Sequence, residues 1–114
     1  VCVDALEGAD PSIEVKPLNQ VESGEQEWIR DLRALCANLR IFELAATAAG
    51  RDLTPETFRA GAESLGEIDV PFLTFASIGP GKWDASDELR LAEYSPEVGD
   101  QGGAKPFGPL ERTD

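Results

Sequence analysis

The apolar residues between Trp28 and Ala49 constrain the fold more than any other feature of the sequence. They are spaced alternately by four and three residues, which lays them along one face of an α-helix. Gly50 follows directly and suits the left-handed position just past a helix end. The set is Trp28, Leu32, Leu35, Leu39, Phe42, Ala46 and Ala49. Because Leu35, Leu39 and Phe42 sit at the centre of this stripe, we expect them to be the deepest core positions.

Signals for the start of this helix lie a few residues upstream. Ser23 followed by Gln26 matches a capping box, and Glu25 and Glu27 fall in the first turn, where the helix dipole favours carboxylates. The sequence therefore predicts a helix over residues 25–49.

A second helix has a full set of start signals. Thr54 stands at the N-cap, Pro55 at the first helical position, and Leu53 is placed to staple against Phe58. Gly66 ends the pattern. The apolar face of this helix is narrow, which indicates packing on the longer helix or on a sheet. That face consists of Phe58, Ala62 and Leu65.

Two or three short strands complete the expected elements. Residues 13–18 alternate as an edge strand would, residues 72–77 are rich in β-formers, and residues 88–94 alternate apolar and polar side chains. The sequence Gly-Pro-Gly-Lys at 79–82 predicts a type II turn, and residues 84–87 predict a second tight turn. We read the Gly-Pro-Gly-Lys segment as a structural turn, because it lacks the spacing of a phosphate-binding loop.

The length of 114 residues fits one domain, built from two main helices and two or three short strands. After residue 94 glycine and proline are frequent and apolar periodicity is lost, so residues 95–114 are expected to form a loosely ordered tail. The chain opens on Val1, Cys2 and Val3, without an initiator methionine or the features of a signal peptide. We therefore expect a fragment or processed product that begins within a helix.

The charge balance narrows the classes of partner. Twenty-two acidic against ten basic side chains give a net charge of −12, which repels phosphate backbones and anionic lipid surfaces. Nucleic acid is therefore not an expected partner, and the acidic surface suits a secreted monomer or a site for a basic partner. No apolar run approaches the ~20 residues of a membrane span, so no membrane insertion is expected.

The sequence offers little chemistry for catalysis or metal binding. Histidine is absent, and Cys2 and Cys36 are the only cysteines, which argues against a zinc site. The two thiols are either buried and free or paired in an oxidising compartment. No nucleophile stands beside a recognisable base, and acidic pairs such as Asp84 and Asp87 are expected by chance. We expect no enzyme activity and no cofactor.

Trp28 and Arg33 are the candidate ligand-binding residues. At the start of the long helix, a tryptophan offers an aromatic wall and an arginine a carboxylate partner for a small anionic or zwitterionic solute. The alternative is that Trp28 belongs to the core and that Arg33 is solvated.

Two blocks of residues, taken in order, resemble a known family. The first is Cys36, Leu39, Phe42, Ala45, Ala46 and Ala49-Gly50, then Asp52-Leu53-Thr54, Phe58 and Leu65-Gly66. The second is Ser77, Gly79-Pro80-Gly81-Lys82, Asp84, Asp87 and Arg90.

The order of these pieces resembles the C-terminal portion of type 1 periplasmic binding proteins, the branched-chain-amino-acid-binding group of ABC-transporter receptors. The likeness covers residues 1–94. Its second block is similar to one secreted branch, although Tyr94-Ser95-Pro96 lacks the cysteine that often follows the last strand there. The resemblance and an extracytoplasmic location together imply a disulfide between Cys2 and Cys36.

The resemblance implies a partial lobe of an α/β fold, with the solute held between this part and a missing N-terminal lobe and delivered to an ABC permease. The function expected is thus an extracytoplasmic solute-binding component for an amino acid or amide, periplasmic, secreted or lipid-anchored. The alternative is a stand-alone secreted acidic domain that docks a protein through an exposed helix face. An enzyme fragment is the third class considered.

Overall fold

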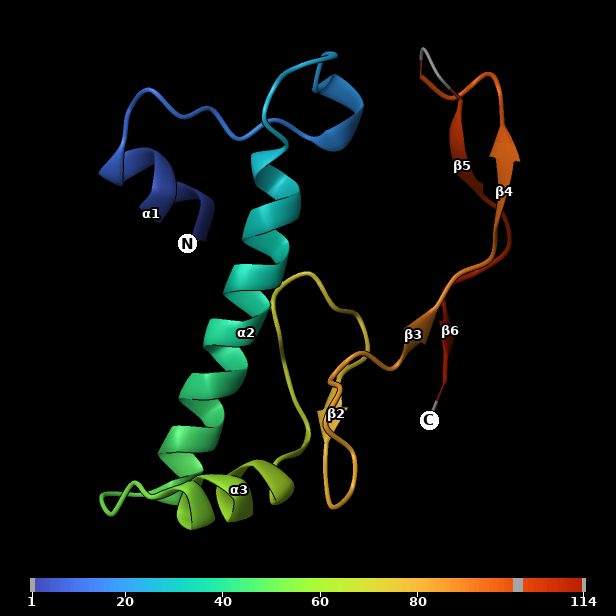
Figure 1. The fold of residues 1–114 in the computed structure, drawn as a ribbon. Coiled ribbons are helices and arrows are strands. Elements are labelled where there is room, and N and C mark those ends of the chain that lie inside the picture. The colour runs from blue at the N-terminus through green and yellow to red at the C-terminus, as the bar shows by residue number, and fades with distance from the viewer. Residues whose placement is uncertain (1, 100–101, 114) are drawn as a thin grey trace.

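Helix α2, Trp28–Ala49, forms the long axis of the computed structural model, which describes residues 2–99 and 102–113 (Figure 1). It ends as predicted at Gly50, whose φ is +82° and whose N–H donates to the carbonyls of Ala46 and Thr47. The predicted start is wrong. Glu27 is the N-cap without a side-chain cap, and the Gln26 amide donates to Asp31 instead of closing a capping box with Ser23.

Helix α3, Pro55–Glu63, crosses the C-terminal end of α2 (Figure 1). Its predicted start is confirmed, because the Thr54 side chain accepts from the N–H of Thr57 and the Thr57 side chain accepts from the N–H of Thr54. The two helices pack at very short range at Gly61. A Cβ on Gly61 would lie 2.6 Å from the carbonyl oxygen of Ala45 and 2.8 Å from the backbone nitrogen of Ala49.

The core is small and lies where α2 and α3 meet the first strands. Its centre is the cluster of Ala45, Ala62 and Ile78. Ile41, Phe58, Leu65, Ile68 and Ala85 pack against this cluster. Phe58, Ala62 and Leu65 therefore face inward, as the sequence predicted for the second helix.

The predicted depth of Leu35, Leu39 and Phe42 is wrong, because their exposed fractions are 55%, 57% and 55%. On α2 the buried residues are Leu32, Cys36 and Ala45. The physical reason is that neighbours cover two flanks of the helix. Cys36 is bonded to α1 on one flank and Ala45 packs on α3 on the other, so the central stripe between them stays uncovered.

Helix α1, Cys2–Ala9, lies beside α2 and has no buried residue. The edge strand predicted at residues 13–18 does not form. The N–H of Val15 donates to the Glu7 side chain instead of to a strand partner, and a 3-10 helix, η1, occupies Leu18–Gln20.

The described residues contain six short strands, more than the two or three predicted, in three antiparallel pairs. β1 (Gly66–Glu67) pairs with β2 (Ser77–Ile78). β3 (Glu88–Leu89) pairs with β6 (Glu111–Arg112), and β4 (Ala92–Ser95) pairs with β5 (Gly103–Pro106). The strand predicted at 72–77 is reduced to its last residue, and the strand predicted at 88–94 is interrupted at residues 90–91.

The turn predicted at residues 79–82 is confirmed: the N–H of Lys82 donates to the Gly79 carbonyl at 3.0 Å, and Gly81 has a φ of +77°. The second turn predicted at residues 84–87 is wrong. These residues are extended, because the N–H of Ser77 donates to the Ala85 carbonyl and Ala76 forms a bridge with Ser86.

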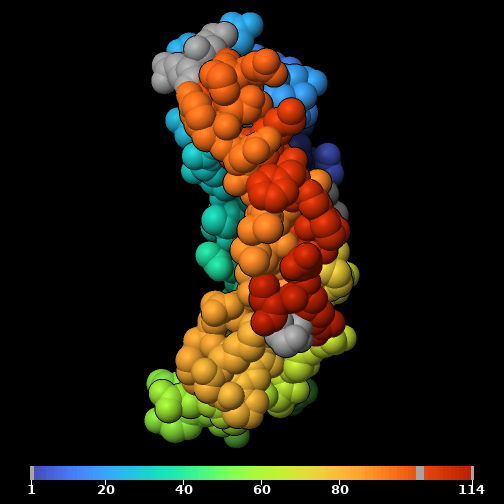
Figure 2. Space-filling view, turned by 90° about the vertical axis from the view of Figure 1, so that its right-hand side faces the viewer, coloured from blue at the N-terminus to red at the C-terminus, as the bar shows by residue number. Residues whose placement is uncertain are grey.

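The C-terminal segment carries two strands where the sequence predicted a loosely ordered tail. Residues 102–113 return along β4 and β3, and the N–H groups of Phe107 and Thr113 donate to the carbonyls of Leu91 and Asp87, each at 2.9 Å. The result is a long two-stranded ribbon. Figure 2 shows its two strands, orange and red, running side by side along one face of the molecule.

The molecule is a mixed helix and strand protein with an open, flattened shape of 51 × 37 × 18 Å. Its radius of gyration is 17.4 Å, whereas a compact domain of this length has one of about 13 Å. Its accessible surface is 8216 Å², against about 6000 Å² for a compact monomer of this mass. All strand pairs among residues 2–99 and 102–113 are antiparallel, so the parallel sheet of an α/β lobe is not seen there.

Candidate functional site

Trp28, the first residue of α2, is half-buried and lines a small polar hollow of about 260 Å³. The connector between α1 and α2 supplies the other walls. The lining residues are Ser12, Glu14, Lys16, Glu25, Gln26 and Trp28. Trp28 is therefore the only aromatic residue among them, and the hollow presents mostly charged and amide groups.

An ion pair between Lys16 and Glu25 crosses this hollow, with 2.6 Å between the ammonium nitrogen and the nearer carboxylate oxygen. The N–H of Glu22 donates to the other oxygen of Glu25 at 2.9 Å. That backbone bond first, and the bond from Lys16 second, lower the pKa of Glu25 below its ordinary value. The same bond to Glu25 raises the pKa of Lys16, so both groups are charged at neutral pH.

Arg33 lies on a different side of α2 from Trp28. Five residues of helix turn the direction of a side chain by about 140°. Arg33 is exposed, and its guanidinium carbon lies 5.9 Å from the centre of the Phe72 ring. The structure thus does not bring Trp28 and Arg33 together in one hollow, and their roles as ligand-binding residues stay predictions.

Phe72 is a residue that the sequence did not single out. Its φ of +68° makes it the only non-glycine residue with positive φ among residues 2–99 and 102–113. Bulky side chains adopt this left-handed conformation at a cost of about 1–3 kcal/mol. The turn is anchored beside it, since Val70 is buried and its carbonyl accepts from the N–H of Leu73 at 3.2 Å.

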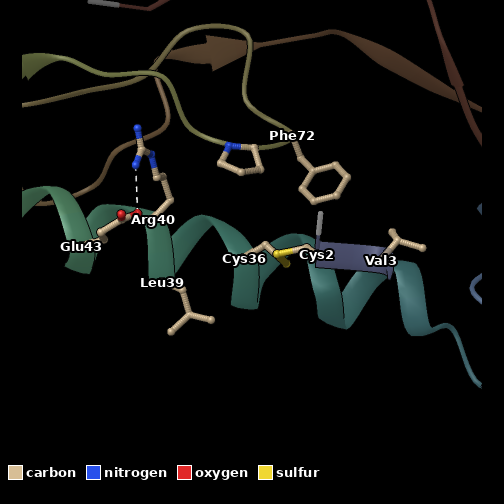
Figure 3. Close-up of a pocket in the computed structure, with 8 residues that line it drawn as sticks. Cys2, Val3, Cys36, Leu39, Arg40, Glu43 and Phe72 are labelled. Atoms are coloured by element: carbon tan, nitrogen blue, oxygen red, sulfur yellow. Dashed lines mark hydrogen bonds and ion pairs between the residues drawn. A yellow bond between two sulfur atoms is a disulfide. The ribbon is translucent and has the colours of Figure 1, made fainter. Parts of the chain in front are cut away.

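An open, mostly apolar depression of about 470 Å³ lies between α1, α2 and the Phe72 turn (Figure 3). Its lining residues are Cys2, Val3, Cys36, Leu39, Arg40, Glu43, Pro71 and Phe72. Arg40 and Glu43 form an ion pair at its polar end, 2.9 Å between nitrogen and oxygen. In Figure 3, Leu39 points away from the Phe72 turn, so the apolar surface continues onto the free side of α2.

A disulfide joins Cys2 of α1 to Cys36 of α2, with 6.3 Å between the Cα atoms. It is the pair that the family resemblance implied. Cys36 is buried, whereas α1 has no buried residue. The disulfide is therefore the main attachment of α1 to the rest of the molecule.

A buried polar cluster stands at the base of the Gly-Pro-Gly-Lys turn. The carboxylate of Asp87, only 1% exposed, lies 2.6 Å from the ammonium nitrogen of Lys82 and accepts from the Ser77 hydroxyl at 2.6 Å. Lys82 also donates to the carbonyls of Ser77 and Asp84, at 2.9 and 2.7 Å. The sequence placed Ser77, Lys82 and Asp87 in one block of motifs but did not predict that their side chains meet, because their spacing alone does not show which acidic residue is buried.

This arrangement suits a structural role better than catalysis. A lysine that activates a serine must be neutral and must face the hydroxyl oxygen. Lys82 instead directs its three donor bonds to the Asp87 carboxylate and two carbonyls. The cluster locks the turn onto strand β2, in agreement with the structural reading of this motif.

Two further features bear on the kind of site. Within residues 2–99 and 102–113, no group of three or more Cys, Asp or Glu side chains is placed to hold a metal ion. None of the helices there is long and apolar enough to cross a membrane. The candidate binding features are the depression beside the disulfide and the hollow beside Trp28.

Comparison with known proteins returned no match to a family model, to a curated protein or to a solved structure.

Proposed function

We propose that this chain is part of an extracytoplasmic solute-binding component of an ABC transporter, and that it contributes one portion of a cleft for a small solute such as an amino acid or amide. The family resemblance of its motifs supports this proposal. A second lobe, outside these residues, supplies the opposite wall, and an ABC permease receives the solute. No chemistry is done on the solute.

The observation that carries the proposal is the open shape of the molecule. Its surface exceeds that of a compact protein of the same mass by about 2000 Å². A domain that stands alone buries its apolar side chains, whereas a portion of a two-lobed protein presents them to the other portion. The disulfide adds weaker support for an extracytoplasmic location, because such bonds persist in oxidising compartments.

The same reasoning predicts that the isolated chain binds solute weakly. A small zwitterion needs nearly complete burial to bind well, because each heavy atom contributes at most about 1.5 kcal/mol. The hollow beside Trp28 is open, and Arg33 does not face it. The isolated chain therefore lacks an enclosing wall.

The test is to titrate leucine, glutamate and a short amide into the isolated chain and into the whole gene product, with tryptophan fluorescence and calorimetry as readouts. Trp83 is exposed, and Trp83→Phe leaves Trp28 as the single tryptophan of the 114-residue chain, so that its fluorescence there reports Trp28 alone. We expect saturable binding by the whole gene product alone. Micromolar binding by the isolated chain, or none by the whole gene product with any solute of these classes, would refute the two-lobe account.

A second candidate, an extracellular acidic domain that docks a protein, is favoured by one observation. Leu35, Leu39 and Phe42 form an uncovered apolar stripe on α2. Exposed apolar surface of this kind marks sites of protein contact.

A further inference from the structure

The uncovered residues of α2 have the spacing of a helix-packing seam. We call Leu35, Leu39 and Phe42 the α2 seam. They continue a strict alternation of three and four residues that runs from Trp28 to Ala49, equivalent to a repeat of 3.5 residues. Such a repeat presents knobs and holes to another helix. Ile41 and Ala45 lie outside the repeat and pack on the protein's own core, whereas the α2 seam does not.

The surroundings leave the α2 seam accessible along its length. α1 lies on one flank of α2 and the ring of Phe58 in α3 lies 5.4 Å from that of Phe42 on the other. The Phe72 turn faces a third side of the helix, since Arg33 reaches it and Leu39 points away from it (Figure 3). The α2 seam therefore has protein on both of its flanks, and its outer face is uncovered.

Charge around the α2 seam defines the partner. Asp31 and Glu43 occupy the positions that flank a 3.5-residue seam, where interhelical ion pairs form. Helix α1 contributes Asp4 and Glu7 and carries no basic residue. Glu43 already pairs with Arg40. Because that pair is exposed, replacing Arg40 by a basic side chain of the partner costs little free energy.

The same charges argue against a second copy of this chain. A copy would bring its own Asp31 and Glu43 to the interface and a further net charge of −12. Like charges opposed across an interface weaken it and slow association.

We propose that the α2 seam docks an amphipathic α-helix of a separate protein, one with aliphatic side chains at the facing positions and Lys or Arg at the flanks. Helix recognition of this kind uses anchors at i, i+4 and i+7, which is the spacing of Leu35, Leu39 and Phe42. The proposal rests on the second candidate function, docking of a protein; it uses no residue of the hollow beside Trp28, although Leu39 also lines the depression beside the disulfide.

The probe is a fluorescently labelled 21-residue helical peptide with leucine at the seam positions and lysine at the flanks. We expect saturable one-to-one binding to the 114-residue chain, measured by fluorescence anisotropy. A peptide with the same composition but its leucines moved off the seam should not bind. A third peptide with glutamate flanks should bind about tenfold more weakly.

Matched variants test whether the peptide binds at the α2 seam. Leu39→Glu and Leu35→Glu should each weaken binding by about 30-fold or more, the loss typical of a central anchor. Leu91→Glu adds the same charge at a similarly exposed leucine on the ribbon and should leave binding unchanged. Circular dichroism of all three variants checks that they remain folded.

Four outcomes would overturn the proposal. Equal binding of the scrambled peptide would show attraction by charge alone, and full binding by Leu39→Glu would place the contact elsewhere. Binding to the isolated chain but not to the whole gene product would show that the protein's own chain covers the seam. Self-association in sedimentation that Leu39→Glu abolishes would identify a second copy as the occupant. The third outcome would assign the α2 seam to a second portion of the same protein, which the two-lobe account allows, whereas the solute titration tests that account by solute binding.

Discussion

Leu32 and Leu39 stand two turns apart on α2, yet their surroundings differ: Leu32 is 5% exposed and Leu39 57%. Leu32→Ala should destabilise the protein by about 2–5 kcal/mol, because it removes buried methyl groups and leaves a cavity. Leu39→Ala should cost less than about 1 kcal/mol, since its side chain is already largely in water. Urea denaturation of both variants measures the difference, and equal losses would contradict the observed packing.

The periodicity of α2 could be predicted from sequence, but the depth of each residue could not. Spacing shows that Leu32 and Leu39 share one face of the helix. Which part of that face is buried depends on where α1 and α3 pack, and the disulfide and Gly61 fix those contacts only in the folded chain. The same limit hid Phe72, whose positive φ is set by the turn after Val70.

Lys82 and Asp87 form the other residue-scale feature that decides stability. Lys82→Met should destabilise the protein by about 2–3 kcal/mol, because it removes an ammonium group from beside a buried carboxylate. The loss falls short of that for a fully buried pair because Lys82 itself is partly exposed. Arg30→Ala, which breaks an exposed pair with Glu27 at 2.8 Å, should cost less than about 1 kcal/mol in the same denaturation experiment. If the two losses are equal, the cluster does not hold the turn.

At the scale of elements, the close approach of α2 and α3 depends on the absence of a side chain at Gly61. Gly61→Ala should destabilise by about 1–3 kcal/mol, because the new methyl group would meet backbone atoms of Ala45 and Ala49 and force the helices apart. Gly8→Ala is the matched control, since nothing lies within 4 Å of its added Cβ and alanine favours helix by up to about 1 kcal/mol. In thermal unfolding, Gly61→Ala should lower the melting temperature and Gly8→Ala should raise it.

Elements with local signals were the predictable ones. Thr54 and Pro55 begin α3 where the sequence placed them, because an N-cap bond needs only residues three apart. Ser23 offered a similar N-cap signal, but no helix begins there. The Glu25 carboxylate instead accepts from the N–H of Glu22 and from the Lys16 ammonium group, and α2 begins at Trp28. The ribbon strands were missed because their partners lie far along the chain and their apolar alternation is short.

The attachment of α1 rests mainly on the disulfide. Replacing Cys2 by Ser should lower the free energy of unfolding by about 4 kcal/mol in the chain-entropy model for a separation of 34 residues. Hydrogen exchange should then show α1 opening while the amides of α3 remain protected. Free thiols titrating in the native, unreduced protein would contradict the disulfide itself.

At the scale of the whole molecule, the helices and the ribbon bury a small core and expose more surface than a compact protein of this mass does. A two-stranded ribbon is marginally stable in water by itself. Leu91 and Phe107 are opposed across it, and both are exposed. The helical part and the ribbon thus each present an apolar face, which favours a chain that completes its fold or its function against other protein.

Small-angle scattering of the isolated chain tests this open architecture directly. We expect a radius of gyration near 17.4 Å at concentrations where the chain is monomeric. A compact domain of this length would give about 13 Å and an unfolded chain about 34 Å, so the three states are well separated. The open value should persist because contraction would require the ribbon to fold back onto α2, and no hydrogen bond between their backbones is present among the described residues. Reduction of the disulfide should leave the ribbon unchanged and increase the radius only through the release of α1. A value near 13 Å in the oxidised protein would show that the apolar faces of α2 and the ribbon close on each other, and neither would then be free for a partner.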